Sequence, residues 1–300
     1  MTEFVEPRLG AGPCPSEILK QKALRSLGDL PLFPTVLNRL MASLAGEDVS
    51  FARIGDLVEK DTVLAGNLLQ MVNSALYARR GTVNSVRHAL SLLGIDKVRN
   101  AVLGMSLTRM WNLVKMPPSW SMTRFNLHSS ATAILSDLLA QRLPVEYPEG
   151  AFAAGLLHDL GRLLIALSLP AEHERILALN ENGARLRVDC EIEVLGFTHA
   201  ELSAEALAAW NLPAPICEAA HYHHQIESEE GDGSGEIPLF RIVRAANNYV
   251  NSMGVSIRAD HSLDCADPTM IASLGLDADQ GIELLAEFKA EQEATAMFFR

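Results

Sequence analysis

The sequence predicts an all-α protein in which an N-terminal helical bundle precedes a second helical subdomain. Apolar residues recur every three to four positions through most of the 300-residue chain, which is the helical period. Alternating runs of β-branched residues, which would indicate strands, are scarce. Hydrophobic residues make up 48% of the chain and charged residues 21%, so the chain has ample apolar material for a folded core.

The N-terminal half is expected to hold an arm and a five-helix bundle. Residues 1–22 lack the basic and apolar regions of a secretory signal and are expected to form a mobile arm. The bundle is expected over residues 23–116, where Ser50 and Asp61 can each cap a helix. Further breaks and starts are indicated at Gly81, at Asn84 or Ser85, at Gly94 and at Asp96, and the last helix should reach about Trp111.

A double proline, Pro117 and Pro118, is the best candidate for the junction between the two subdomains, because it cannot continue a helix. The second subdomain is expected over residues 119–300. Its predicted helices cover about 122–142, 150–168, 170–182, 199–210, 215–225 and 237–253, with further helices toward Arg300. The acidic, glycine-rich stretch from Glu227 to Glu236 should be an exposed, mobile loop.

The charge of the chain argues against nucleic acid as a partner. A formal net charge of −12 opposes the electrostatic attraction that supplies most non-specific affinity for nucleic acid. One basic stretch departs from this balance, since a single acid, Asp96, accompanies Arg79, Arg80, Arg87, Lys97 and Arg99. An anion or an acidic protein could dock there, and an ordinary solvated surface is the alternative.

Composition also indicates the compartment. No run approaches about 18 uninterrupted apolar residues, so no membrane span is expected. The cysteines Cys14, Cys190, Cys217 and Cys265 lie far apart without CxxC pairing, which fits a reducing environment. We therefore expect the protein in the cytoplasm.

Three polar residues interrupt the apolar segment from Ala151 to Leu167. Its leucines gather on one helical face, and His158, Asp159 and Arg162 lie on the other face among alanines and glycines. Such small residues let a neighbouring element come close, so we expect the helix to be packed on both sides. A carboxylate enclosed there is costly unless ionic or hydrogen-bonding partners satisfy it, and Asp159 therefore needs a partner.

Histidines elsewhere in the second subdomain are the candidate partners of Asp159. His128 lies on an apolar helix face and should point toward the core. His199 follows Thr198, which can cap a helix, and the positive helix end there keeps the ring neutral. A further helix carries His221, His223 and His224. Neutral imidazoles around one carboxylate suit a divalent transition metal, which could be iron, manganese, nickel or zinc, and which could activate a bound water.

Two alternatives to such a metal site stay open at this point. His128 and His199 could be hydrogen-bonded core histidines, with the three histidines of the later helix on the surface. Alternatively, Cys217, His221 and His224 could form a ligand stripe at i, i+4 and i+7, although three ligands on one short helix enclose an ion poorly.

A set of segments resembles the HDOD domain, a signalling relative of the HD phosphohydrolase superfamily, over residues of about 30–250. In chain order they are "LPLFPTVLNRLMASL", "LVEKDTVLAGNLLQMVNSALY", "VNSVRHALSLLGIDKVRN", "HSSATA", "GLLHDLGRLL", "LGFTHAEL", "AAWNLPAPICEAAHYHH" and "IVRAANNYV". Thr62 stands where the family usually has proline. The resemblance implies an N-terminal bundle followed by an HD-like helical core.

The resemblance also implies metal ligands and departures from them. His128 matches the first histidine ligand, His158 and Asp159 match the His-Asp pair that names the superfamily, and His199, His223 and His224 resemble the further histidines of the dinuclear HD-GYP branch. Asn247 stands where the closing aspartate is expected, and no GYP segment follows the His-His pair. Arg162 and Asn247 would then support the ligands or contact phosphate.

Family resemblance implies a bacterial signalling output module that acts by binding a partner protein or a small-molecule ligand, with a degenerate HD metal site. The alternative is a metal-dependent phosphohydrolase that acts on a phosphodiester or a nucleotide.

Overall fold

The computed structural model describes residues 14–32, 34–44, 51–74, 76–77, 82–180, 185–225, 235–257 and 268–299. These residues form helices joined by turns, and within them no strand occurs, although one isolated parallel bridge links Val145 and Ile237. The all-α prediction is confirmed.

The predicted N-terminal bundle is formed by α2 to α6. Their bounds are α2 Thr35–Leu44, α3 Phe51–Glu59, α4 Thr62–Val72, α5 Val86–Leu93 and α6 Ile95–Trp111. Asp61 caps α4 by accepting from the backbone N–H groups of Val63 and Leu64, and Ser85 caps α5 by accepting from His88. Gly94, with φ of 83°, ends α5 in a conformation that favours glycine. These predicted signals are confirmed, whereas Ser50 and Gly81 lie outside the described residues.

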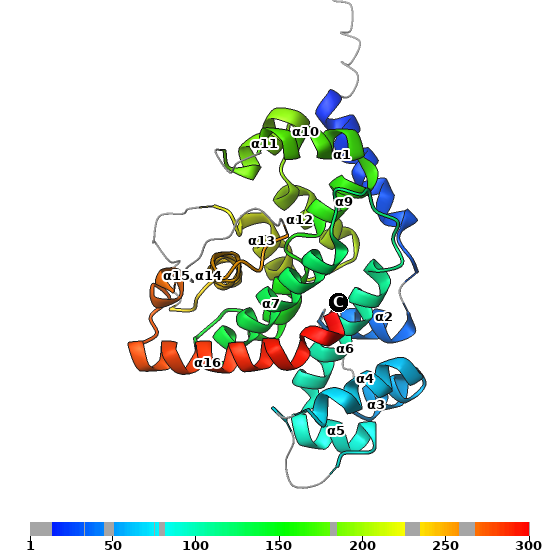
Figure 1. Cartoon of the computed structure of the whole chain (residues 1–300), viewed down its shortest axis with the longest axis vertical. Helices are drawn as coiled ribbons and strands as arrows, with labels where there is room; N and C mark the ends of the chain where they lie inside the picture. The colour runs from blue at the N-terminus through cyan, green and yellow to red at the C-terminus, as the bar shows by residue number, and fades with distance from the viewer. Residues whose placement is uncertain are drawn as a thin grey trace, which may run out of the picture.

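The chain starts differently from the expected arm. Residues from Pro15 onward form α1 (Pro15–Arg25), followed by the 3-10 turn η1 (Ser26–Asp29). Helix α1 lies against α9, α11 and α12 of the second part, at the top of Figure 1. Proline at the first position of α1 favours a helix start there. Lys20 of α1 pairs with Glu205 at 2.7 Å and with Glu201 at 3.6 Å, which holds the helix on the protein surface. Residues 1–13 lie outside the described residues.

The second part is built around α7, which packs against α8 and α14. The bounds of its helices are α7 Met122–Ala140, α8 Ala151–Leu157, α9 Leu160–Ser168, α10 Pro170–Leu179, α11 Arg187–Leu195, α12 His199–Ala209, α13 Ala214–Tyr222 and α14 Leu239–Ser252. A short 3-10 turn, η2 (Pro148–Gly150), precedes α8. In Figure 1, α7, α12, α13 and α14 occupy the middle of the molecule, with α10 and α11 above them.

The structure differs from the sequence prediction at two helices of this part. The single helix expected over 150–168 is broken at His158 and Asp159, where the backbone of Asp159 leaves helical geometry (φ −97°, ψ 14°). Arg162 N then donates to Asp159 O at 2.9 Å, a tighter i to i+3 turn that restarts the helix. Helix α11 was not predicted.

The C-terminal segment joins the two parts. Helix α15 (Thr269–Ala272) precedes α16 (Ala278–Thr295), which Asp277 and Gln280 start with a reciprocal capping box. Helix α16 packs along α7, and the final turn η4 (Ala296–Phe299) contacts α6 and α7, so that the C-terminus lies next to the N-terminal bundle (Figure 1). The predicted loop 227–236 falls almost wholly outside the described residues.

One apolar core runs through the described chain, from Ala23 to Phe288. The junction at Pro117 and Pro118 falls in the turn between α6 and α7, and its role as a subdomain boundary stays a prediction. Within the described residues, the stretch Pro148–Ser168 is apolar and long enough to span a membrane, but 89% of its apolar 18-residue window is buried inside the protein. Its apolar character therefore serves the core.

Candidate metal centre

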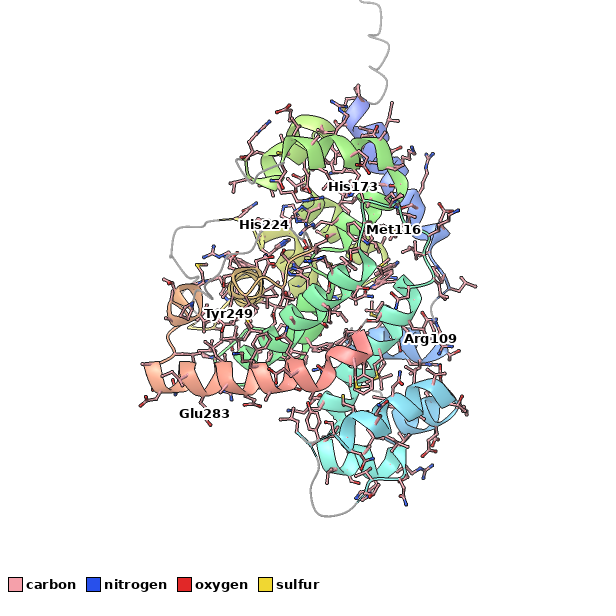
Figure 2. The ribbon with its side chains drawn as sticks, viewed as in Figure 1. Arg109, Met116, His173, His224, Tyr249 and Glu283 are labelled. Atoms are coloured by element: carbon pink, nitrogen blue, oxygen red, sulfur yellow. The ribbon has the colours of Figure 1, made fainter. Side chains whose placement is uncertain are left out.

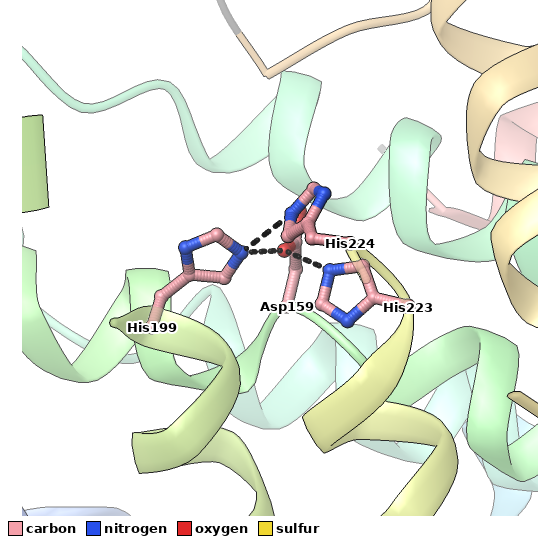
Figure 3. Close-up of side chains that lie close together, drawn as sticks. All are labelled: Asp159, His199, His223 and His224. Atoms are coloured by element: carbon pink, nitrogen blue, oxygen red, sulfur yellow. Dashed lines mark hydrogen bonds and ion pairs between the residues drawn. The ribbon is translucent and has the colours of Figure 1, made fainter. Parts of the chain in front are cut away.

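Asp159 and five histidines from separate elements meet in the middle of the second part. His128 comes from α7, and His158 and Asp159 come from the break between α8 and α9. His199 begins α12, where Thr198 accepts from the backbone N–H of Glu201, and His223 and His224 follow the end of α13. Figure 3 shows His199, His223 and His224 turned toward Asp159. The break in the helix matters here, because it lets adjacent residues His158 and Asp159 face the same point.

The two carboxylate oxygens of Asp159 face different histidines. Oδ2 lies 3.6 Å from Nε2 of both His128 and His158. Oδ1 lies 3.1 Å from His199 Nε2 and 3.6 Å from His223 Nε2. His224 Nε2 lies 3.0 Å from His199 Nε2. The cluster is thus two groups of ligand atoms that share Asp159, one with His128 and His158 and the other with His199, His223 and His224.

Backbone carbonyls hold three of these rings with Nε2 directed inward. Nδ1 of His128, His158 and His223 donates, at 2.8 Å in each case, to the carbonyl oxygens of Val255, Gly155 and Ala220 respectively. When Nδ1 carries the proton of a neutral imidazole, Nε2 presents a lone pair. All three Nε2 atoms are buried without a hydrogen-bond partner, and so is Asp159 Oδ1, which accepts no well-formed hydrogen bond despite its closeness to His199.

Glu191 and Arg187 of α11 hold His199, and sequence reasoning missed both. Glu191 is fully buried, and its Oε2 accepts from His199 Nδ1 at 2.6 Å and from the His199 backbone N–H at 2.9 Å. Arg187 Nε donates to Glu191 Oε1 at 2.8 Å. A carboxylate behind a ligating histidine is a common support of metal sites, because it fixes the tautomer and the ring orientation. The signal in the sequence is the placement of Glu191 on the buried face of α11, one turn after Arg187.

Burial keeps most of the imidazoles neutral. It lowers the pKa of His158 to about 3 against the attraction of Asp159, and it also lowers the pKa of His128 and His223. Burial alone would raise the pKa of Asp159, but Arg162 and His158 hold it well below its usual range. The site therefore contains an ionised acid among neutral imidazoles.

His199 is the exception. Burial would lower its pKa, but Glu191 and Asp159 raise it. Burial alone would raise the pKa of Glu191, but His199 outweighs burial and lowers this pKa to about 2. The ring of His199 therefore lies between two carboxylates, with Glu191 at Nδ1 and Asp159 at Nε2. A cation bound at Nε2 would require that nitrogen to be unprotonated.

The residues present fit a transition-metal ion. Ligand atoms bound to one such ion at about 2.0–2.2 Å lie about 3–3.5 Å from one another. The pairs Asp159–His199, Asp159–His223 and His199–His224 lie at 3.0–3.6 Å, and all four ligand atoms lie within 4.8 Å of one another. Imidazole nitrogens with one carboxylate are a donor set for zinc, iron, nickel or manganese. Arg162 Nη1 donates to Asp159 Oδ2 at 2.9 Å, so its positive charge opposes a cation on the Oδ2 side and leaves the Oδ1 side free. The group with His199, His223 and His224 is therefore the better metal site.

Asn247 has an amide partner on its own helix. It is buried on α14, and its Oδ1 accepts from Asn251 Nδ2 at 2.8 Å, within the same helix. Cys217 and His221, candidates for a stripe with His224, do not converge with it among the described residues. Cys217 Sγ donates to Leu212 O, and the ring of His221 meets that of Tyr222 edge-on.

The basic stretch is largely neutralised where it is described. Arg87 pairs with Asp56 at 2.9 Å and Glu59 at 3.7 Å, and Lys97 lies 3.8 Å from Glu291. Arg99 pairs with Asp96. Acids distant in the sequence thus supply the partners that the local pattern lacked. Arg79 and Arg80 lie outside the described residues.

Comparison with known proteins finds a family and several similar folds. The model of the HDOD domain family matches residues 30–226. An uncharacterized protein of Treponema pallidum (strain Nichols) is 23% identical over 280 residues, which cover 89% of this chain and 51% of that protein. The chain thus spans about half the length of this relative.

Solved structures share the fold. An HDOD domain protein with unknown function from Geobacter sulfurreducens is 23% identical, with a TM-score of 0.74 over 93% of this chain and 97% of that chain. A protein from Marinobacter aquaeolei VT8, provisionally named for signal transduction, is 23% identical, with a TM-score of 0.69 over 95% and 65% of the two chains. One from Shewanella amazonensis SB2B, provisionally named a phosphohydrolase, is 22% identical, with a TM-score of 0.71 over 93% and 98%. At these identities the likeness shows the fold alone.

Proposed function

This chain belongs to the HDOD family, and from that premise we propose that it is a regulatory module of bacterial signal transduction with a metal-binding core. The module holds a divalent transition metal at Asp159, and it acts by binding a partner protein or a small-molecule ligand. Turnover of a substrate is not its role. The Marinobacter protein of similar fold, provisionally named for signal transduction, is consistent with this proposal.

The observation that carries the proposal is the single carboxylate at the centre. Among the described residues, Asp159 is the one acid in both groups of converging ligand atoms. Asn247, where the family resemblance expects a second acid, has its amide oxygen engaged by Asn251. An uncharged amide is a weaker ligand than a carboxylate, so the His128 and His158 side is poorly equipped for a second ion.

The residues of this chain would hold one metal and restrict its surroundings. Asp159 Oδ1 with His199, His223 and His224 would bind it, and Glu191 would fix the ring of His199. Arg162 would neutralise the other carboxylate oxygen of Asp159. When bound, such a metal supplies a Lewis acid and a bridge between α9, α12 and α13. We assign it a structural or ligand-sensing role.

A second candidate function, metal-dependent phosphohydrolysis, is favoured by one feature. Two groups of ligand atoms share Asp159, as two-metal hydrolytic sites share a bridging acid, and His224 is exposed at the edge of the centre. The Shewanella protein provisionally named a phosphohydrolase has a similar fold.

Turnover measurements separate the two functions. The full chain, purified without chelators, is assayed against cyclic dinucleotides, nucleotides and generic phosphodiesters with added manganese, iron, nickel or zinc. The regulatory proposal expects metal retention and no turnover above the level of the Asp159→Asn variant. Activity that depends on Asp159 and survives in the matched surface variant Asp96→Asn would establish the phosphohydrolase and overturn the proposal.

A further inference from the structure

A second concentration of unsatisfied polar atoms lies beside the metal centre, on the side formed by α9, α10, α11 and the end of the α6–α7 connection. The atoms are buried and have no hydrogen-bond partner: Trp120 Nε1, Arg162 Nε, Arg187 Nη2 and both ring nitrogens of His173. Nearly all buried polar groups of folded proteins are satisfied. A group of unsatisfied donors is therefore a candidate position for a further molecule or for buried water.

These residues are neighbours in space. The rings of Trp120 and His173 lie 5.9 Å apart, and only 9% and 2% of their surfaces are exposed. His173 belongs to α10, which packs on α9 and α11, the helices of Arg162 and Arg187. Both guanidinium groups act on the pKa of His173, which burial first and then Arg187 and Arg162 lower to about 4 against the opposing acids Glu174 and Glu191. Figure 2 shows His173 in the same part of the molecule as His224, away from Arg109 and Glu283.

The chemistry of this group suits an oxyanion. Arg162 uses Nη1 on Asp159, and Arg187 uses Nε on Glu191, so each guanidinium keeps a free N–H after its carboxylate is bound. Trp120 supplies a third N–H, and a neutral His173 supplies a fourth. Several N–H donors, two of them on guanidinium groups, are a common recognition set for phosphate and carboxylate groups.

The nearby acids do not fill these positions. The carboxylates of Asp159 and Glu191 are engaged by His199 and by their own arginines. Glu174 accepts from Ser119 Oγ, so its carboxylate has a partner of its own next to Trp120. Buried water would also satisfy the free donors, and the phosphate titration below separates water from an anion.

We propose that Trp120, Arg162, His173 and Arg187 form a pocket for a tetrahedral oxyanion, the phosphoryl group of a ligand or inorganic phosphate. The pocket includes both arginines that support the metal centre. A phosphorylated ligand bound there would therefore act on Asp159 through Arg162, and on His199 through Arg187 and Glu191. The inference deepens the proposed function by naming the ligand class. It rests on that function only for the coupling to the metal, because anion binding itself needs no metal.

Calorimetric titration of the chelator-treated full chain with inorganic phosphate tests the pocket. The wild type is expected to bind one phosphate per chain. Trp120→Phe and His173→Phe should each raise the Kd for phosphate at least about tenfold, since each change removes one hydrogen bond to a charged group. Trp210→Phe and His88→Phe make the same chemical changes elsewhere and should bind phosphate like the wild type. The two pocket variants should fold, because the atoms they lose have no protein partner.

The contrary results are equally defined. Phosphate heats no larger than dilution, or an affinity unchanged in both pocket variants, would overturn the pocket and leave buried water as the partner of these donors. Metal content measured on untreated samples of the same preparations separates this failure from that of the proposed function. If the protein retains metal but its phosphate binding does not depend on the pocket residues, the inference alone is overturned. If phosphate binding depends on Trp120 but the protein retains no metal, the proposed metal-binding function alone is overturned.

Discussion

At the scale of single residues, the orientation of imidazole rings decides what the centre can bind. Backbone carbonyls accept hydrogen bonds from Nδ1 of His128, His158 and His223, and the carboxylate of Glu191 accepts one from Nδ1 of His199. Every one of these rings therefore turns Nε2 toward Asp159. If these histidines only made hydrogen bonds within a core, their buried Nε2 atoms would be expected to have partners, yet several have none.

The residues of this cluster could be predicted from the sequence, whereas those that support them could not. Its histidines and Asp159 carry chemical identities that a motif preserves, and all of them meet in the structure. Glu191 and Arg187 look like an ordinary i, i+4 surface pair, and only the packing of α11 reveals that they are buried and point inward. The orphan nitrogens of His173 were likewise invisible, because satisfaction of a hydrogen bond is a property of the folded surroundings.

Glu191→Gln should weaken metal binding about 10- to 100-fold while the protein stays folded. The amide keeps the shape of the side chain but loses the negative charge that supports His199 at 2.6 Å. The measurement is a titration of metal-free protein with Co²⁺, followed by visible absorption. Glu193→Gln, two residues along on the exposed side of α11, is the matched control. Equal affinity of the Glu191 variant and the wild type would remove the supporting role of this carboxylate.

His173 should make the protein sensitive to acid. Burial lowers its pKa to about 4, so between that value and about 6.5 the unfolded chain binds a proton that the folded chain does not. The stability that the neutral ring contributes is complete above about pH 6.5 and is lost as the pH falls. Between pH 7 and pH 5 this amounts to roughly 2 kcal/mol from this one group.

The corresponding measurement is chemical denaturation at several pH values. His173→Phe, measured metal-free, should lose less stability than the wild type on acidification by about that amount, with His88→Phe as the exposed control. Parallel pH profiles of the His173 variant and the wild type would show that this ring does not titrate below its usual range.

At the scale of elements, close helix packing brings the ligands together. A methyl group at Gly161 of α9 would lie 2.1 Å from the backbone oxygen of His199, so α9 and α12 touch through this glycine. Gly155 of α8 similarly leaves no room beside Ala133 of α7, where a methyl group would lie 2.8 Å from Cα. The small residues that suggested a doubly packed helix in the sequence are the contact points of neighbours on both sides.

Element boundaries were predictable where local signals exist. Caps at Asp61 and Ser85 and the left-handed Gly94 are local chemistry, and the structure has them where expected. The break at His158 and Asp159 has no proline or left-handed glycine to announce it. It follows from tertiary contacts, because both side chains must reach the same centre. Helix α1 was missed for a similar reason, since its partners α9, α11 and α12 lie more than a hundred residues away.

Gly161→Ala should cost several kcal/mol of stability and weaken metal binding, because backbone atoms of α12 must move and His199 moves with them. Gly66→Ala on α4, where a methyl group meets nothing within 4 Å, should instead stabilise the protein by about 0.5–1 kcal/mol through its better helix propensity. Urea denaturation of both variants checks the pair. Similar stabilities for the two variants would refute the close contact between α9 and α12.

At the scale of the whole molecule, the C-terminal helix joins the N-terminal bundle to the part that holds Asp159. Glu291 of α16 accepts from Tyr77 Oη at 2.7 Å and lies 3.8 Å from Lys97. The ring of Phe299 lies against Gly104 of α6, and Arg142 of the α7 end pairs with Glu287. The order of helices and the all-α class were readable from the chain, but this return of the C-terminus was not, because it joins segments about 200 residues apart.

The continuous core predicts that both parts unfold together. Phe299→Ala should remove about 3–4 kcal/mol and leave a single transition, because Phe299 is buried at the contact between η4 and α6. Met297→Ala, which is 57% exposed in the same turn, should cost far less. Scanning calorimetry checks both variants. Two separate transitions in the wild type would instead support independent folding of residues 23–116 and 119–300.

The proposed metal centre consists of Asp159 together with His199, His223 and His224. X-ray absorption spectroscopy of the full chain, loaded with its retained metal or with one equivalent of Co²⁺, tests this most directly. A metal bound at Asp159 should show a first shell of nitrogen and oxygen ligands with the multiple-scattering signature of several imidazoles. This shell should be lost in Asp159→Asn but not in Asp96→Asn. A shell without imidazoles, or one that Asp159→Asn leaves unchanged, would contradict it.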